Sequence, residues 1–237
     1  MLRSMAGTNL LTHPLRTPLV AASILSAGFA RMGDECRAAV DAGADLLHLD
    51  VMHGHFVPNL TMGPDMCRGV HEELPETCLD IHLMVTDPAM YVEAFARAGA
   101  SNFTFHIEAV PQPAALARAV HDAGMTAGLA INPPTDVKAI LPFVNLFDVI
   151  LIMSVNPGYS GQSFIGAVLD KARAVKPLLK PSQRLEIDGG VYGQTAGACR
   201  SAGCDVLVGV SAIYHAKDYA AAIAELRGSP MSASRRT

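Results

Sequence analysis

The sequence predicts a closed (β/α)8 TIM barrel, an α/β fold of eight parallel strands each followed by a helix. From residue 18 onward, short runs rich in Leu, Val and Ile alternate with longer, Ala-rich amphipathic segments, which is typical of repeated βα units. The repeat length of about 20 to 30 residues is that of one βα step. Eight such units in roughly 210 residues fit a closed barrel better than an open sheet, whose edge strands would stay uncovered.

Each element follows from the local pattern. Apolar runs predict strands at residues 19–25, 45–51, 78–85, 102–108, 126–131, 148–155, 184–187 and 205–213. Amphipathic segments predict helices at residues 30–42, 88–98, 113–123, 165–179, 194–202 and 218–226, with only short helices after the second and fifth strands. Several helices should end at a glycine in the left-handed conformation, namely Gly43, Gly99, Gly124 and Gly203.

No linker or charge run divides this pattern, so we expect one catalytic domain at residues 18–227. Residues 1–17 are interpreted as a flexible extension and residues 228–237 as a flexible tail. The first segment lacks acidic residues and carries Arg3 and Arg16, so an organellar targeting segment is the alternative.

The composition favours a small-molecule enzyme. Of 237 residues, 50% are hydrophobic and 17% are charged, and the net charge is −4, which favours neither nucleic acid nor an acidic membrane surface as partner. No apolar run reaches the length of a membrane span. The five cysteines form no C-x-x-C pair, so we expect free thiols in a reducing compartment, the cytoplasm.

Four residues near strand ends predict a metal site. His48 and Asp50 are two residues apart in an apolar run, so a strand would point both to one face. His82 lies in the third strand and Asp188 follows the seventh. Any one of them alone is better explained as a hydrogen-bonded core residue. Together, two imidazoles and two carboxylates suit one divalent ion such as zinc, iron(II), manganese or cobalt, since burying them unpaired costs of the order of several kcal/mol per ion.

Glycine-rich loops follow the last three strands. They read Asn156-Pro157-Gly158-Tyr159-Ser160-Gly161-Gln162, Asp188-Gly189-Gly190-Val191 and Gly209-Val210-Ser211-Ala212. Bare backbone N–H groups at this end of a barrel can bind a phosphate. The alternative is a set of ordinary tight βα turns.

These motifs resemble the ribulose-phosphate 3-epimerase family. The resemblance extends over about residues 19–226 and is carried by five runs: Ser23-Ile24-Leu25-Ser26, His48-Leu49-Asp50-Val51-Met52 with Phe56-Val57-Pro58-Asn59, His82-Leu83-Met84-Val85, Asn156-Pro157-Gly158 and Glu186-Ile187-Asp188-Gly189-Gly190-Val191. It implies a barrel of the ribulose-phosphate-binding type that interconverts D-ribulose 5-phosphate and D-xylulose 5-phosphate in the pentose phosphate pathway.

The resemblance also assigns roles to residues. It implies that His48, Asp50, His82 and Asp188 hold the metal and that Asp50 and Asp188 transfer protons. The residues implied to contact substrate are Ser23, Met52, His82, Met84 and Met153 around the reacting carbons, and Gly158, Tyr159, Ser160, Gly161, Gly189, Gly190, Val210 and Ser211 at the phosphate.

Elementary chemistry agrees with these roles. Inverting a carbon beside a ketone requires a proton to leave one face and another to arrive at the opposite face, so two acid/base groups are needed. A divalent ion stabilises the resulting enediolate as a Lewis acid. No organic cofactor is required.

The sequence departs from the family pattern at four positions. His53 replaces the usual aspartate, and we interpret it as a tolerated loop change; the alternative is an altered proton supply or metal preference. Gly28 also replaces an aspartate, with a consequence expected only in the first loop. Ser160 and Val210 stand where glycine is usual, so phosphate affinity depends on whether those positions need a glycine-only conformation.

Three other functions fit parts of the sequence. A related ketose phosphate such as allulose 6-phosphate would use the same four ligands. A catalytically silent sugar-phosphate-binding barrel would fit the changes at His53, Gly28 and Val210 but not the four intact ligand positions. A phosphate-binding barrel enzyme of amino-acid biosynthesis would leave the His-x-Asp and His-Leu-Met runs without a reason. Exposed apolar helix faces lead us to expect a homo-oligomer.

Overall fold

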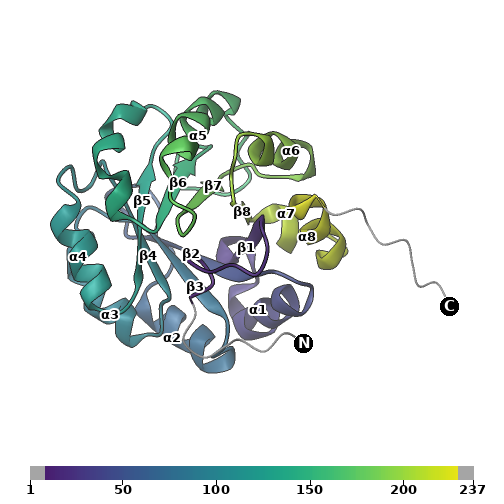
Figure 1. Cartoon of the computed structure of the whole chain (residues 1–237). Coiled ribbons are helices and arrows are strands. Elements are labelled where there is room, and N and C mark those ends of the chain that lie inside the picture. The colour runs from purple at the N-terminus through teal and green to yellow at the C-terminus, as the bar shows by residue number, and fades with distance from the viewer. Residues whose placement is uncertain (1–8, 229–237) are drawn as a thin grey trace.

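The computed structural model describes residues 9–228 and forms a closed barrel of eight parallel strands (Figure 1). Each strand pairs with its neighbour in sequence, and β8 returns to pair with β1. The predicted fold class is therefore confirmed. The strands are β1 (Leu19–Ser23), β2 (Leu46–Met52), β3 (Cys78–Met84), β4 (Asn102–His106), β5 (Thr126–Ile131), β6 (Val149–Met153), β7 (Arg184–Asp188) and β8 (Val206–Gly209).

Helices surround the barrel as an outer layer (Figure 1). The α-helices are α1 (Met32–Asp41), α2 (Pro64–Glu73), α3 (Val92–Arg97), α4 (Ala114–Asp122), α5 (Leu169–Val175), α6 (Gly193–Ser201), α7 (Ser211–Tyr214) and α8 (Tyr219–Arg227). Short 3₁₀ helices occur at Ile24–Ser26, Phe29–Arg31, Pro88–Tyr91, Val137–Ala139, Leu141–Leu146, Gly166–Val168 and Lys176–Leu178. Within residues 9–228, none of the helices is both long and apolar enough to cross a membrane.

Several predicted elements were wrong in length: the first and fourth strands end two residues earlier than predicted, at Ser23 and His106, and the helix predicted at residues 165–179 is α-helical only over Leu169–Val175. The helix after β2 is not short, because α2 has 10 residues and begins with Pro64 at its first turn, a position that proline favours. The last strand does not extend to residue 213, since β8 ends at Gly209 and α7 begins at Ser211. The short connection after β5 is confirmed by two 3₁₀ turns, and the four helix-ending glycines all have positive φ.

The closed barrel buries every strand. Outward-facing strand residues pack against the helices in one large apolar cluster, while smaller apolar clusters lie inside the barrel. Because side chains alternate along a strand, the remaining inward positions form a buried polar column: Ser23, His48, Asp50, Asp80, His82, Asn102, Thr104, His106, Glu186 and Asp188.

Part of the predicted N-terminal extension closes the amino-terminal end of the barrel. Leu11 is 1% exposed and packs with Leu19 and Leu46. The Arg184 side chain donates a hydrogen bond from Nε to the Leu11 carbonyl at 2.8 Å, and Asn9 donates to the Ser101 carbonyl. Residues 1–8 of that extension, and residues 229–237 of the predicted tail, lie outside the described residues.

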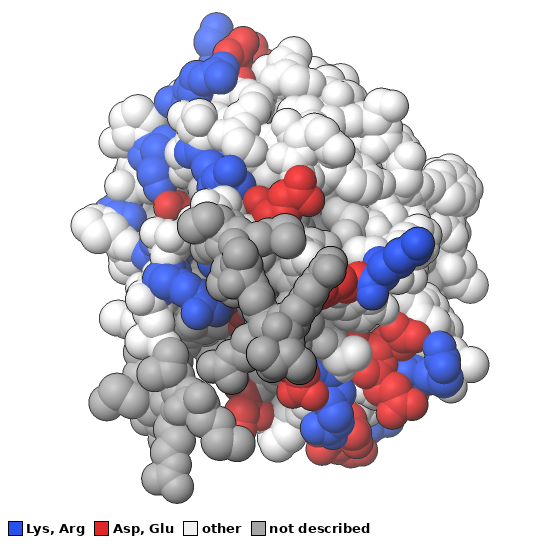
Figure 2. Space-filling view, turned by 90° about the vertical axis from the view of Figure 1, so that its right-hand side faces the viewer, with Lys and Arg blue, Asp and Glu red and all other residues white. Residues whose placement is uncertain are grey.

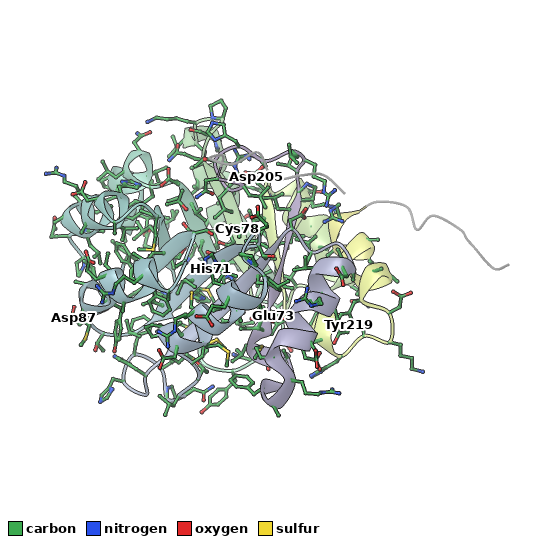
Figure 3. The ribbon with its side chains drawn as sticks, turned by 90° about the horizontal axis from the view of Figure 1, so that it is seen from below. His71, Glu73, Cys78, Asp87, Asp205 and Tyr219 are labelled. Carbon is green, nitrogen blue, oxygen red and sulfur yellow. The ribbon has the colours of Figure 1, made fainter. Side chains whose placement is uncertain are left out.

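The outer surface carries charges of both signs. Acidic and basic side chains lie next to one another in the lower part of the face shown in Figure 2. Glu73 on α2 and Tyr219 on α8 belong to the outer layer (Figure 3). Arg37 pairs with Glu73, and the Tyr219 hydroxyl donates to Glu35 at 2.9 Å, so side chains of this layer connect neighbouring helices.

We expect Leu11→Ala to lower the free energy of unfolding by about 2–4 kcal/mol, because it removes a fully buried side chain and leaves a cavity. Leu15→Ala is the matched control, since Leu15 is 76% exposed and should change stability by less than about 0.5 kcal/mol. Urea denaturation followed by circular dichroism measures both. Equal effects of the two substitutions would contradict the packing role of Leu11.

Candidate active site and metal centre

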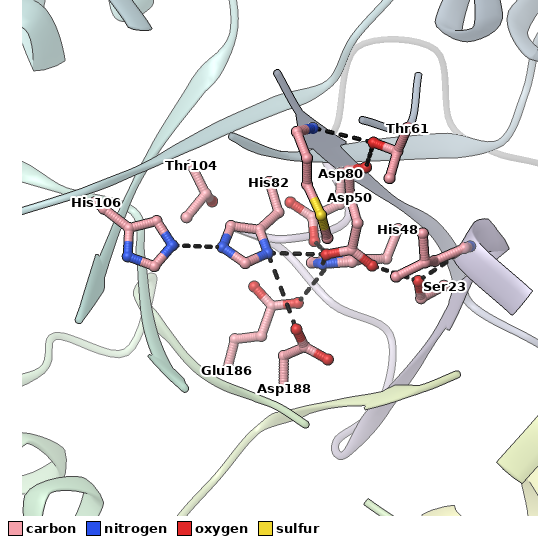
Figure 4. A network of polar contacts seen from close by, with 12 residues as sticks. Ser23, His48, Asp50, Thr61, Asp80, His82, Thr104, His106, Glu186 and Asp188 are labelled. Atoms are coloured by element: carbon pink, nitrogen blue, oxygen red, sulfur yellow. Dashed lines mark hydrogen bonds and ion pairs between the residues drawn. The ribbon is translucent and has the colours of Figure 1, made fainter. Parts of the chain in front are cut away.

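Four side chains from three strands converge inside the barrel (Figure 4). His48 and Asp50 come from β2, His82 from β3 and Asp188 from β7, and all four are buried. One ligand atom of each lies within 4.8 Å of the others. The β2–β3 register sets Asp50 opposite His82, so strand pairing brings together residues that are 32 positions apart in the sequence.

The atoms that face one another have the character of metal ligands. His48 Nε2 lies 3.4 Å from Asp50 Oδ1. His82 Nδ1 lies 3.0 Å from the same oxygen and 3.9 Å from Asp188 Oδ2. His48 Nε2 and Asp188 Oδ1 are buried without a hydrogen-bond partner. Two nitrogens and two carboxylates with such unpartnered atoms fit a divalent transition metal or zinc.

The two aspartates have pKa values shifted in opposite directions. Burial raises the pKa of Asp50, but His48 and His82 outweigh it and hold that pKa well below its usual range. Burial and the nearby Asp50 charge raise the pKa of Asp188 to about 7. Burial lowers the pKa of His82 to about 4. One carboxyl group is thus ionised while its counterpart titrates near neutrality, an arrangement that suits paired acid/base work.

A second polar layer lies beneath these residues, and we did not predict it from the sequence. His48 donates from Nδ1 to Asp80 Oδ2 at 2.6 Å, and Asn102 donates to Asp80 Oδ1 at 2.6 Å. Glu186 Oε1 is 3.6 Å from His48 Nδ1, and burial raises the pKa of Glu186 to about 8. The signal was available, since Asp80 precedes His82 by two residues and Glu186 precedes Asp188 by two, the period of a strand face.

Asp50 is oriented from its outer side by a hydroxyl group. Ser23 donates to Asp50 Oδ2 at 2.6 Å, leaving Oδ1 to face the two histidines. Thr61 donates to the Asp50 carbonyl and accepts from the Met52 N–H. Ser23 was predicted to contact substrate, but it does not line the open cleft. Neither His48 nor His82 lines it.

The open cleft lies above the metal cluster at the carboxyl ends of the strands. Asp50, Asp188 and the three predicted methionines line it. The eight predicted phosphate-site residues line the same cleft, namely Gly158, Tyr159, Ser160, Gly161, Gly189, Gly190, Val210 and Ser211. A single cavity thus joins the acidic groups to glycine-rich backbone.

Backbone geometry explains some of these glycines. Gly190 has φ 61°, and a Cβ there would lie 2.8 Å from the Phe164 nitrogen, so glycine is required. Val210 has φ −100°, which lies outside the left-handed region that favours glycine. A valine at this position therefore leaves the backbone free of left-handed strain.

Two loops meet over one side of this cleft. The Asn59 side chain donates to the Gly158 carbonyl at 2.7 Å, and the Tyr159 hydroxyl donates to the Pro58 carbonyl at 2.7 Å. The loop after β2 is thereby connected to the glycine-rich loop after β6. These two hydrogen bonds fix the position of the glycine-rich loop relative to β2, the strand that carries Asp50.

His53 turns away from the metal cluster. Its Nε2 accepts from the Thr86 backbone N–H at 3.1 Å, and its ring packs edge-on against His55 at 4.9 Å. His53 therefore connects the loops after β2 and β3. At Gly28, an added Cβ would approach only the flexible end of Glu35, at 3.2 Å.

The fold and the site define an α/β-barrel enzyme with a candidate divalent-metal centre beside a glycine-rich cleft. Residues 19–214 match the Ribulose-phosphate 3 epimerase family. The chain belongs to this family, and it is an isomerase of the epimerase type.

Named relatives agree over nearly the whole chain. A ribulose-phosphate 3-epimerase of Mycobacterium tuberculosis is 44% identical over 220 residues, covering 92% of this chain and 95% of that protein. One from Bacillus subtilis is 43% identical over 216 residues, covering 89% and 98%. In fold, a 3-keto-L-gulonate-6-phosphate decarboxylase from Vibrio cholerae superposes with TM-score 0.70 at 14% identity, covering 90% of this chain and 97% of that one.

We expect His53→Ala to leave divalent-metal affinity unchanged within about twofold, because both ring nitrogens of His53 face Thr86 and His55 instead of the metal cluster. His82→Ala is the comparison. Loss of a residue that only hydrogen-bonds to a metal ligand typically weakens metal binding 10–100-fold, so loss of His82 itself should weaken it at least as much. Competition with a chromogenic chelator measures both affinities. A large loss in His53→Ala would show that the loop histidine does act on the metal.

Proposed function

We propose that the chain catalyses the reversible 3-epimerisation of D-ribulose 5-phosphate and D-xylulose 5-phosphate. The observation that supports this most is the placement of Asp50 and Asp188 on different strands of one barrel, lining a single cleft. Together with glycine-rich backbone in that cleft, this suits a substrate with an acidic C–H at one end and a phosphate at the other.

The proton transfer is assigned to the two aspartates. Epimerisation beside a carbonyl group removes a proton from one face of C3 and delivers a proton to the other. The ionised carboxylate accepts the first proton while the protonated carboxyl group supplies the second, and the roles exchange in the reverse direction. The opposed pKa shifts of Asp50 and Asp188 match this division, and Ser23 holds Asp50 in orientation through Oδ2.

His48, Asp50, His82 and Asp188 would hold one divalent cation. When bound, the ion supplies electrophilic stabilisation of the negative charge that develops on the substrate oxygens. Zinc, iron(II), manganese and cobalt all accept this set of two nitrogen and two oxygen ligands.

The methionines provide an apolar wall beside the reacting carbons. Met52 and Met84 pack with Val57 in one apolar cluster, and Met153 belongs to another. Thioether side chains exclude water while remaining polarizable, and a water-poor site strengthens the electrostatic interactions that stabilise the deprotonated substrate.

The phosphate is assigned to backbone N–H groups of the three glycine-rich loops. Gly190 lets its loop pack against the backbone of Gln162 and Phe164, where a side chain would clash. Val210 and Ser160 still offer backbone donors. A neutral backbone cradle binds a phosphate by its oxygens, so no nearby arginine is required.

The cellular setting is also a proposal. All five cysteines are free, and burial raises the pKa of the Cys36 and Cys67 thiols to about 12, which keeps them protonated and suits a reducing compartment such as the cytoplasm. The homo-oligomer stays a prediction.

Asp188→Asn and Asp50→Asn should each lower kcat for epimerisation at least about 100-fold, because each removes one of two required proton-transfer groups. Solvent exchange distinguishes the two: in D₂O, one variant should exchange the C3 proton of ribulose 5-phosphate without epimerising it, and the other should do so for xylulose 5-phosphate. Coupled enzymatic assays and proton NMR, at matched bound-metal content, measure these rates.

Asp170→Asn is the control, since Asp170 is exposed on α5 and pairs with Arg173. Near wild-type turnover in Asp188→Asn would contradict the two-base assignment. Higher kcat/KM on allulose 6-phosphate than on ribulose 5-phosphate would assign the longer substrate, and a wild-type protein inactive on both would indicate a silent barrel.

A further inference from the structure

A buried hydrogen-bond chain extends from His82 away from the other ligands. His82 Nε2 lies 2.8 Å from His106 Nε2, and His106 Nδ1 lies 3.2 Å from Glu108 Oε2. Both imidazoles are fully buried, and their rings stack with centroids 5.0 Å apart (Figure 4). The chain therefore connects a candidate metal ligand on β3 to the loop that follows β4.

Glu108 fixes the direction in which this chain donates. Its Oε1 accepts from the Asn132 backbone N–H at 2.8 Å and from the Thr135 hydroxyl at 2.5 Å. Burial opposes ionisation, but contacts with His106, Thr135 and Asn132 hold the pKa of Glu108 at about 2. An ionised carboxylate only accepts hydrogen bonds, so Oε2 must receive the Nδ1–H of His106.

The protonated nitrogen of each imidazole then follows. A neutral histidine with hydrogen on Nδ1 has a lone pair on Nε2. When a cation occupies the site and neutralises Asp50, which otherwise competes for a hydrogen from His82 Nδ1, His106 accepts from the Nε2–H of His82. With its hydrogen on Nε2, His82 has a free lone pair on Nδ1. That is the nitrogen that faces Asp50 and Asp188.

We propose that His106 and Glu108 are positioning residues that set the tautomer and the ring orientation of His82, so that Nδ1 is ready to bind the cation. This inference rests on the proposed function for the cation's role, and it adds two residues to the site. Phe56 packs on the outer side of His106 with ring centroids 4.9 Å apart, which limits rotation of that ring. Histidine ligands are commonly oriented in this way through their second nitrogen.

The other histidine ligand has a shorter arrangement of the same kind. His48 donates from Nδ1 directly to Asp80, which leaves Nε2 free to face the cluster. In the longer chain, a neutral imidazole separates the carboxylate from the ligand. Each neutral imidazole has one donor and one acceptor nitrogen. A single change at Glu108 can therefore reverse the direction of both hydrogen bonds that connect Glu108, His106 and His82.

Glu108→Gln makes that change with almost no change in shape. The Asn132 N–H needs an acceptor, so the glutamine carbonyl should take the place of Oε1 and the NH₂ group should face His106. The glutamine NH₂ group can donate only to an unprotonated Nδ1 of His106. The hydrogen of His106 would then lie on Nε2, and the hydrogen of His82 would lie on Nδ1. His82 would then donate to Asp50 Oδ1, 3.0 Å away, and compete with the cation.

We expect Glu108→Gln to weaken Zn²⁺ and Co²⁺ binding about 10–100-fold, measured by chelator competition and by the visible spectrum of the Co²⁺ form. Thr135→Val is the matched control: it removes one hydrogen bond to Glu108 but preserves the Asn132 contact and the direction of the chain, so affinity should change less than about threefold. Thermal unfolding of both metal-free proteins checks that they are folded.

Imidazole ¹⁵N NMR of the Zn²⁺-loaded wild-type protein tests the tautomers directly. The proposal requires hydrogen on Nε2 of His82 and on Nδ1 of His106 in the Zn²⁺-loaded wild type, with both reversed in metal-free Glu108→Gln. Hydrogen on Nε2 of His106 in the Zn²⁺-loaded wild type, or equal metal affinity in wild type and Glu108→Gln, would overturn it. Failure of the wild type to bind a divalent cation at all would instead overturn the proposed function.

Discussion

The contact of the Asp50 carboxylate with two buried imidazoles is the interaction on which the rest of the site depends. Asp50 Oδ1 faces both His48 and His82, while Oδ2 accepts from Ser23. In a barrel interior such a charge is stable only if it is paired and hydrogen-bonded. On the far side of the two rings, His48 contacts Asp80, and His82 contacts His106, which in turn contacts Glu108.

The barrel supplies the geometry for this interaction. Parallel pairing places the carboxyl ends of all strands at one end, where the cleft opens, and residues 9–17 close the opposite end. Access to the polar column is thus directed through the cleft. Bridging contacts between the loops after β2 and β6 hold the glycine-rich backbone on the same side as Asp50.

Much of this arrangement is encoded in local patterns. The alternation of strands and helices predicts the barrel, and the spacing of His48 and Asp50 predicts that they share a face. Asp188 is predictable from its position at the end of an apolar run. These features are readable because each depends on strand periodicity within a few residues.

Other features depend on contacts between distant segments and could not be read locally. The packing of Leu11 requires the open end of a barrel formed by residues far along the chain. The pairing of His106 with His82 depends on where the β3 and β4 side chains meet in the lumen. The orientation of His53 toward Thr86 depends on the path of two loops.

The central claim is that one divalent cation binds between the histidines and aspartates at the base of the cleft. Anomalous X-ray diffraction at the absorption edge of the bound metal tests it directly in crystals of the metal-loaded protein. The account predicts one strong peak about 2.0–2.2 Å from His48 Nε2, His82 Nδ1 and a carboxylate oxygen of Asp50 and of Asp188. A peak elsewhere, with these four side chains unligated in catalytically active protein, would contradict it.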